Sequence, residues 1–162
     1  DALGPRTVQR ILVTMGAGAA PPVRGLRPVA AVAPGVAAAT GLSLQQLAAA
    51  LVGQLRPAAV VCVDSLCSAE GQRLGRTVQF SDSGLYPAQT DHTRHLTRDT
   101  LGVPVVAAGI PTLMQAQEGA DLVVTPRALD SVIAHGAALL AGSVNRALQP
   151  RLTVQQLCWL TG

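Results

Sequence analysis

The sequence predicts an α/β protein with a three-layer αβα arrangement around a mostly parallel sheet. Short apolar runs alternate along the chain with longer segments of helical periodicity, which is the pattern of strands connected by helices. Residues 58–63 are apolar without interruption, as is typical of a strand buried on both faces of a parallel sheet. The chain has 162 residues, of which 49% are hydrophobic and only 2% aromatic. This length suits one domain with a core of closely packed Ala, Val and Leu.

The chain is expected to begin with a helix, a loop and a strand. Val8, Ile11 and Met15 recur at helical spacing and predict an amphipathic helix over residues 5–15. A segment rich in glycine and proline follows and predicts a loop. The short apolar run at 28–33 ends at a proline and a glycine, so we expect a buried strand there.

The middle of the chain is expected to contain a helix, two strands and one long loop. Ser43 and Gln46 match a capping box and predict a helix that runs to about residue 55. The apolar strand at 58–63 comes next. Residues 76–80 alternate between polar and apolar and predict a more exposed strand. The polar stretch at 81–98 predicts a loop.

The last third is expected to add two strands and two helices. Apolar runs at 104–108 and 122–124 predict the strands. Thr125 and the proline that follows it predict the start of a helix that runs to about residue 148. A last short helix is expected over 154–160.

Charge and composition exclude several classes of function. The net charge is +3, and all twelve basic residues are arginines that are scattered along the chain. Without a basic face or interleaved aromatic residues, we expect no nucleic-acid partner. No apolar run reaches the roughly 18 residues of a membrane helix, and polar sequence follows Asp1, so neither a membrane span nor a signal peptide is expected. Cys62, Cys67 and Cys158 are odd in number and lie among apolar residues, which indicates reduced thiols in a cytoplasmic protein.

Two aspartates are candidates for chemistry. Asp64 follows the apolar run at 58–63, so we expect it at the carboxyl end of a buried strand, where catalytic groups collect in α/β sheets. Partial desolvation raises the pKa of such a carboxylate and suits it to acid–base work. The alternative is that Asp64 caps the turn that follows, since aspartate is a favoured N-cap. Asp1 has the same alternative role ahead of the first helix, and spacing alone does not show that the two aspartates meet.

The polar loop suggests a different chemistry. It holds His92 together with Asp82 and Asp91, and a neutral imidazole with carboxylates can bind a divalent metal ion. The sequence contains neither HExxH nor a pair of CxxC motifs, so we expect no metal and no cofactor. The alternative for these residues is a solvated loop.

A series of short segments covers most of the chain, to about residue 148. They are Asp-Ala-Leu-Gly-Pro at 1–5, Leu-Val-Thr at 12–14, Arg-Pro-Val-Ala-Ala-Val-Ala-Pro-Gly-Val at 27–36, Thr-Gly at 40–41, Val-Asp-Ser-Leu at 63–66, Val-Gln-Phe-Ser-Asp-Ser-Gly at 78–84, Thr-Leu-Gly-Val-Pro-Val-Val at 100–106, Gly-Ile-Pro-Thr at 109–112 and Val-Thr-Pro at 124–126. In this order the segments resemble the germination protease family of spore-forming bacteria, peptidase family A25.

The resemblance implies a fold similar to that of the hydrogenase maturation endopeptidases. It also implies an endopeptidase that activates water with two aspartates, which fall on Asp1 and Asp64 in the matching motifs. Family members act on small acid-soluble spore proteins in the spore core. They are made as homo-oligomeric zymogens that process their own amino terminus.

The family has a strand directly ahead of its first aspartate. We therefore expect residues 1–162 to form a single peptidase domain that lacks an upstream first strand. The expected partners are a protein or peptide substrate, a docked amino-terminal segment of the same precursor, and further copies of the chain. Two alternatives remain open. One is a metal-binding maturation endopeptidase with Asp1, Asp64 and His92 around a divalent ion, and the other is an inactive, protease-like binding module.

Overall fold

The computed structural model describes residues 2–16, 24–35, 37–86, 95–115 and 123–162. They form two compact units, one over Pro34–Val132 and one made of Ala2–Ala33 and Ile133–Gly162. The first unit contains a mixed sheet with short helices, and the regular elements described in the second unit are helices. The chain is therefore an α/β protein, as its sequence pattern predicts.

The sheet of the first unit is built around one long strand, β3 (Val105–Gln115). Strand β1 (Val60–Ser68) pairs with β3 in parallel along its whole length. The two short strands, β2 (Gln79–Ser81) and β4 (Val123–Val124), pair with β3 antiparallel. The expectation of a mostly parallel sheet is thus correct for the β1–β3 pair, but the described sheet is mixed because the short strands return against β3.

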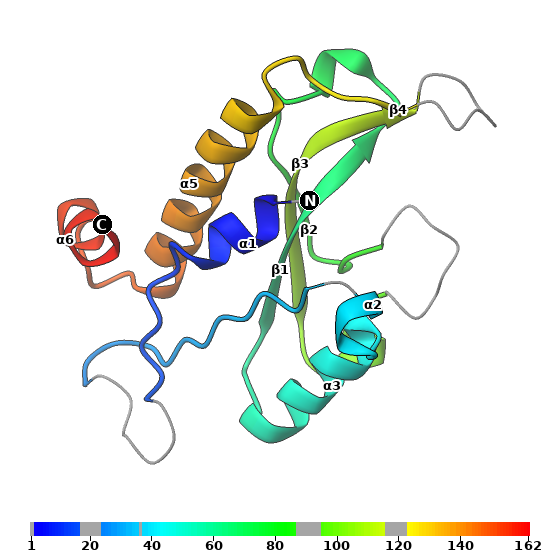
Figure 1. Ribbon diagram of the computed structural model, residues 1–162. Helices are drawn as coiled ribbons and strands as arrows, with labels where there is room; N and C mark the ends of the chain where they lie inside the picture. The colour runs from blue at the N-terminus through cyan, green and yellow to red at the C-terminus, as the bar shows by residue number, and fades with distance from the viewer. Residues whose placement is uncertain (1, 17–23, 36, 87–94, 116–122) are drawn as a thin grey trace. The chain divides into compact units, whose positions relative to one another are not determined.

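Helix α3 (Leu44–Leu55) covers one face of this sheet near the ends at which β1 and β3 begin (Figure 1). The hydroxyl of Ser43 accepts from the N–H of Gln46, and the Gln46 side chain accepts from the N–H of Ser43, which is the expected capping box. Leu44, Ala48 and Val52 of α3 pack on a buried apolar cluster, which we call the α3 core. Its members are Cys62, Leu85, Leu96, Leu101, Val105 and Ala107.

The other helices are short except for α5 (Leu129–Leu148). Helix α5 begins three residues later than the predicted start at 126, whereas α6 (Val154–Thr161) begins with a Thr153 capping box close to the expected position. The remaining helical elements are α1 (Leu3–Val8), α2 (Ala37–Thr40), α4 (Arg98–Leu101) and a 3-10 turn, η1 (Gly71–Arg73).

Two predicted elements of the second unit are wrong. Helix α1 ends at Val8 instead of continuing to residue 15, and residues 28–33 form no strand. The N–H groups of Thr14 and Met15 both donate to the carbonyl of Val29 at 3.0 Å, and the N–H of Val29 donates to the Thr14 hydroxyl at 2.9 Å. These tertiary hydrogen bonds take the place of helix and ladder bonds for the same backbone groups.

Two buried amide side chains, Asn145 and Gln149, bind backbone groups of residues 10–12 and 27, and we call this pair the amide clamp. Asn145 accepts from the N–H of Leu12 at 2.9 Å and donates to the carbonyl of Arg10 at 2.8 Å. Gln149 accepts from the N–H of Arg27 at 3.0 Å and donates to the carbonyl of the same residue at 2.8 Å. Both side chains are buried. The clamp therefore satisfies backbone groups that no regular element pairs.

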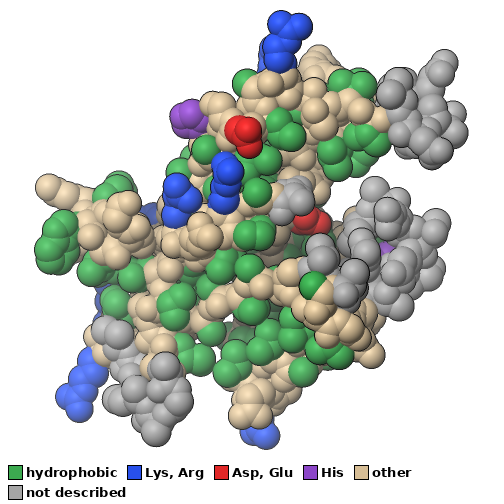
Figure 2. All heavy atoms as spheres, viewed as in Figure 1, with side chains coloured by type: hydrophobic (Ala, Val, Ile, Leu, Met, Phe, Trp, Pro, Cys, Tyr) green, Lys and Arg blue, Asp and Glu red, His purple; other side chains and the backbone are tan. Residues whose placement is uncertain are grey.

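Among the described helices, none is both long and apolar enough to cross a membrane. On the face shown in Figure 2, arginine side chains lie singly or in twos rather than in one continuous area. This agrees with the scattered positions of arginine in the sequence.

Candidate functional site

Asp64 lies inside β1 and not at its carboxyl end. The ladder with β3 continues past it, with Asp64 opposite Gly109 and Ser68 opposite Met114. The prediction that this strand ends at residue 63 is therefore wrong, as is the alternative of an N-cap. The polar side chains of Asp64 and Ser65 interrupt the apolar pattern, but a parallel ladder pairs backbone groups and does not require apolar side chains.

The alternation of side chains along β1 places Asp64 on the same face as Cys62 and Leu66. Cys62 belongs to the α3 core, so Asp64 lies on the α3 side of the sheet, one position beyond that core. Its side chain is half-buried, and the N–H of Ser65 donates to its Oδ1 at 2.8 Å. This hydrogen bond holds one carboxylate oxygen in place.

The negative charge of Asp64 contributes to the pKa of the Cys62 thiol. Burial, and to a smaller extent the negative charge of Asp64, raises the pKa of Cys62 to about 11. The thiol is therefore protonated at neutral pH and is not a nucleophile. Cys67 and Cys158 are exposed, and all three cysteines are free thiols.

Gly109 allows β3 to lie close to Asp64. A Cβ on this residue would collide with the backbone oxygen of Asp64 and would lie 2.7 Å from Cγ of Leu66. Backbone oxygen cannot move aside as a flexible side chain can, so only glycine fits without displacing β1. Gly109 is thus a positioning residue that sequence reasoning identified only as part of a family motif.

We expect Gly109→Ala to lower the free energy of unfolding by about 1–3 kcal/mol, because overpacking forces β1 and β3 apart. Urea unfolding followed by circular dichroism measures this. Gly53→Ala in α3 is the matched control: its added Cβ meets nothing within 4 Å, and alanine stabilises a helix interior by up to about 1 kcal/mol. A Gly109→Ala protein that was as stable as the parent would disprove the close approach at Gly109.

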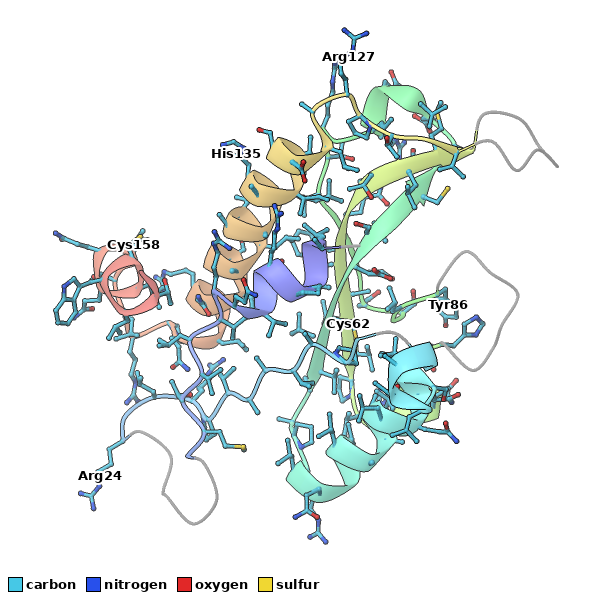
Figure 3. All side chains as sticks on the ribbon, in the orientation of Figure 1. Arg24, Cys62, Tyr86, Arg127, His135 and Cys158 are labelled. Atoms are coloured by element: carbon cyan, nitrogen blue, oxygen red, sulfur yellow. The ribbon has the colours of Figure 1, made fainter. Side chains whose placement is uncertain are left out.

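A hollow of about 210 Å³ lies next to Asp64 within the first unit. Leu66 and Gly109, the neighbours of Asp64 along β1 and across to β3, both line it. Tyr86, in the segment after β2, also lines the hollow, and Figure 3 shows it together with Cys62 on β1. The full lining consists of Leu66, Gln79, Phe80, Ser81, Gly84, Leu85, Tyr86, Ala107, Ala108 and Gly109. The hollow thus shares Leu85 and Ala107 with the α3 core, and Asp64 neighbours two of its lining residues, Leu66 and Gly109.

Asp1, Asp91 and His92 lie outside the described residues, so the pairing of Asp1 with Asp64 stays a prediction. The same holds for the metal site of Asp1, Asp64 and His92. Within the part of the chain that the structure describes, no three His, Cys, Asp or Glu side chains come together as a metal site requires. Asp82 is described and is exposed beside β2.

Comparison with known proteins matches the part of the chain that contains Asp64 and the hollow to one protein family. A family model described as germination protease matches residues 1–119. A germination protease of Halalkalibacterium halodurans is 38% identical over 83% of this chain and 36% of its own length. The germination protease of Bacillus subtilis is 38% identical over 72% of this chain and 33% of its own length. One of Clostridium perfringens is 28% identical over 97% of this chain and 64% of its own length.

This chain therefore spans less than two thirds of the length of these relatives. The region that the family model matches contains Asp64, Gly109 and every residue that lines the hollow. The resemblance found in the sequence motifs is confirmed: the chain belongs to the germination protease family.

Proposed function

We propose that this chain carries the catalytic part of an endopeptidase, in which Asp64 and Asp1 activate a water molecule for attack on a peptide carbonyl. The proposal rests on the position of Asp64 in the structure. Asp64 belongs to a family motif, is half-buried within β1, and has two residues that line the hollow, Leu66 and Gly109, as its neighbours. A carboxylate in such a position can take a proton from water while the substrate lies beside it.

Two carboxylates that share one proton can divide the work between them. One removes the proton from water as it attacks, and the other donates a proton to the leaving amine. The Ser65 N–H holds Oδ1 of Asp64, which directs the carboxylate without neutralising it. The protonated thiol of Cys62 lies next to it on the strand and takes no part in this proposal.

The finer features of the family belong to the same proposal. They are the three-layer fold of the hydrogenase maturation endopeptidases, small acid-soluble spore proteins as substrates in the spore core, autoprocessing, and assembly into a homo-oligomer. In the described sheet β1 pairs with β3 alone and lies at the edge. This open edge supports pairing with a further strand, which the docked amino-terminal segment of a precursor would supply.

A chelator test separates the aspartate mechanism from the metal-dependent alternative. We expect the rate of cleavage of a small acid-soluble spore protein to change by less than about twofold when EDTA is added, because two carboxylates need no Lewis acid. Gel electrophoresis and mass spectrometry of the products measure the rate. A loss of activity that Zn²⁺ or Mn²⁺ restores would favour the metal site, and intact substrate under all conditions would favour an inactive binding module.

A further inference from the structure

We infer that the second unit binds an anionic lipid surface, with Trp159 of α6 entering the lipid and neighbouring arginines contacting the headgroup phosphates. Peripheral binding of this kind needs no helix that crosses the membrane. The inference goes beyond the proposed peptidase, because it uses none of the residues of the candidate site. It rests on the charge of the unit and on the exposed face of one helix.

Charge is unevenly divided between the two compact units. The second unit contains six arginines and no aspartate or glutamate, so its side chains carry a formal charge of +6. The first unit, counted with Asp1, contains six arginines and all nine acidic residues, which gives a formal charge of −3. No arginine of the second unit can therefore pair with an acidic side chain of its own unit, and the unit attracts an anionic surface.

The amide clamp brings four of these arginines to the end of α5, and we call them the arginine corner. The clamp bonds to the backbone of Arg10 and of Arg27, and both residues are exposed. Arg146 lies between the two clamp residues on α5, Arg151 follows the clamp by two positions, and both are exposed. Exposed guanidinium groups donate paired hydrogen bonds to phosphate oxygens. These residues are far apart in the sequence, and only the fold places them at one end of α5.

Helix α6 follows the arginine corner (Figure 1) and presents apolar side chains to solvent. Its buried residue is Leu157, and Trp159 lies two positions further, about 200° around the helix, on the opposite side. The Trp159 side chain is 85% exposed, and Val154 and Leu160 on either side of it are 64% and 46% exposed. The helix contains no charged residue. Its outer face is therefore an uncharged, partly apolar surface next to a basic one.

This combination favours lipid over the other anionic partners. Trp159 is the only aromatic residue of the second unit, whereas proteins that bind single-stranded nucleic acid stack successive bases on several rings. A folded acidic protein would need a pocket shaped for the protruding ring, whereas fluid lipid accepts it without one. Tryptophan is enriched at the boundary between lipid and water. Stable peripheral binding requires two contributions, and an apolar helix face with a basic patch supplies both.

Trp159 is the only tryptophan of the chain, so its fluorescence measures the contact directly. The protein is mixed with vesicles of equimolar phosphatidylglycerol and phosphatidylcholine at physiological ionic strength. We expect it to sediment with these vesicles, its emission to shift to shorter wavelength, and its binding to pure phosphatidylcholine vesicles to be at least about tenfold weaker. Replacing both Arg146→Ala and Arg151→Ala should weaken binding by roughly 25-fold, because each arginine near an anionic surface contributes about fivefold. Trp159→Ala, measured by sedimentation, should weaken it by about tenfold.

Arg127→Ala is the matched control, because Arg127 is an exposed arginine of the first unit, and it should leave vesicle binding unchanged. Circular dichroism checks that each variant is folded. Equal binding to both kinds of vesicle, or an unchanged affinity in the double arginine variant, would overturn the inference. So would the absence of vesicle binding together with Trp159-dependent binding of a DNA oligonucleotide, of polyglutamate or of a second copy in sedimentation velocity. Peptide cleavage is measured in parallel and should be unaltered in these variants, so failure of the lipid surface and failure of the peptidase are distinguished.

Discussion

Asp64→Asn is expected to lower kcat for peptide hydrolysis by about 10²–10⁴-fold while leaving the fold intact. An amide cannot accept a proton from the attacking water, and loss of a general base costs rates of this order. The amide oxygen can still accept the hydrogen bond from the Ser65 N–H, which keeps the side chain in place. Steady-state kinetics measures the loss, and thermal unfolding followed by circular dichroism measures the stability.

Asp130→Asn is the matched control, because Asp130 is an exposed carboxylate in the first turn of α5 and its change should leave kcat unaltered. Thiol titration gives a second signal. Since the charge of Asp64 helps to raise the pKa of Cys62 to about 11, the pKa should fall toward its ordinary value in Asp64→Asn but remain above it, because burial is the larger cause. An Asp64→Asn protein that retained most of its activity would exclude Asp64 as the base.

Asn145→Ala is expected to reduce the free energy of unfolding by roughly 2–4 kcal/mol, through the loss of two part-buried hydrogen bonds of a buried side chain. The substitution leaves the N–H of Leu12 and the carbonyl of Arg10 without this partner, and a group that loses its partner inside a protein costs about 1–3 kcal/mol. A loss of this size is a large part of the stability of an ordinary domain. Urea unfolding followed by circular dichroism measures it.

Arg146→Ala is the matched control for the clamp. Arg146 is the next residue on α5 and is exposed, and its side chain donates to the carbonyl of Pro150 at the surface. Its loss should change the stability by less than about 0.5 kcal/mol. Equal stability losses for the two variants would show that helix α5, and not the amide clamp, is the sensitive feature.

Local patterns were sufficient for elements whose stabilising contacts are near in sequence. The Ser43 capping box and the start of α6 are correct because a cap involves residues three apart. The apolar run at 58–63 located β1, and the motif Val-Asp-Ser-Leu identified Asp64 through the family resemblance. In these cases the information lies within a few residues of the element that it predicts.

Distant partners decided the remaining features. The predicted helix over 5–15 ends early because Leu12 and Thr14 bond to Asn145 and to the 27–29 segment instead of to their own turn. Strand β1 continues beyond Asp64 because β3 supplies a ladder partner that apolar alternation cannot reveal.

For the candidate site, too, local patterns predicted some features, and contacts between distant residues decided the others. Composition, motifs and order along the chain determined the α/β class, the family and Asp64 as the candidate carboxylate. Only the tertiary structure showed that Gly109 must be glycine beside Asp64, and that Leu66, Leu85 and Tyr86 meet around one hollow. Those contacts join residues from separate strands and loops. They depend on strand register and close packing, which no local pattern in the sequence encodes.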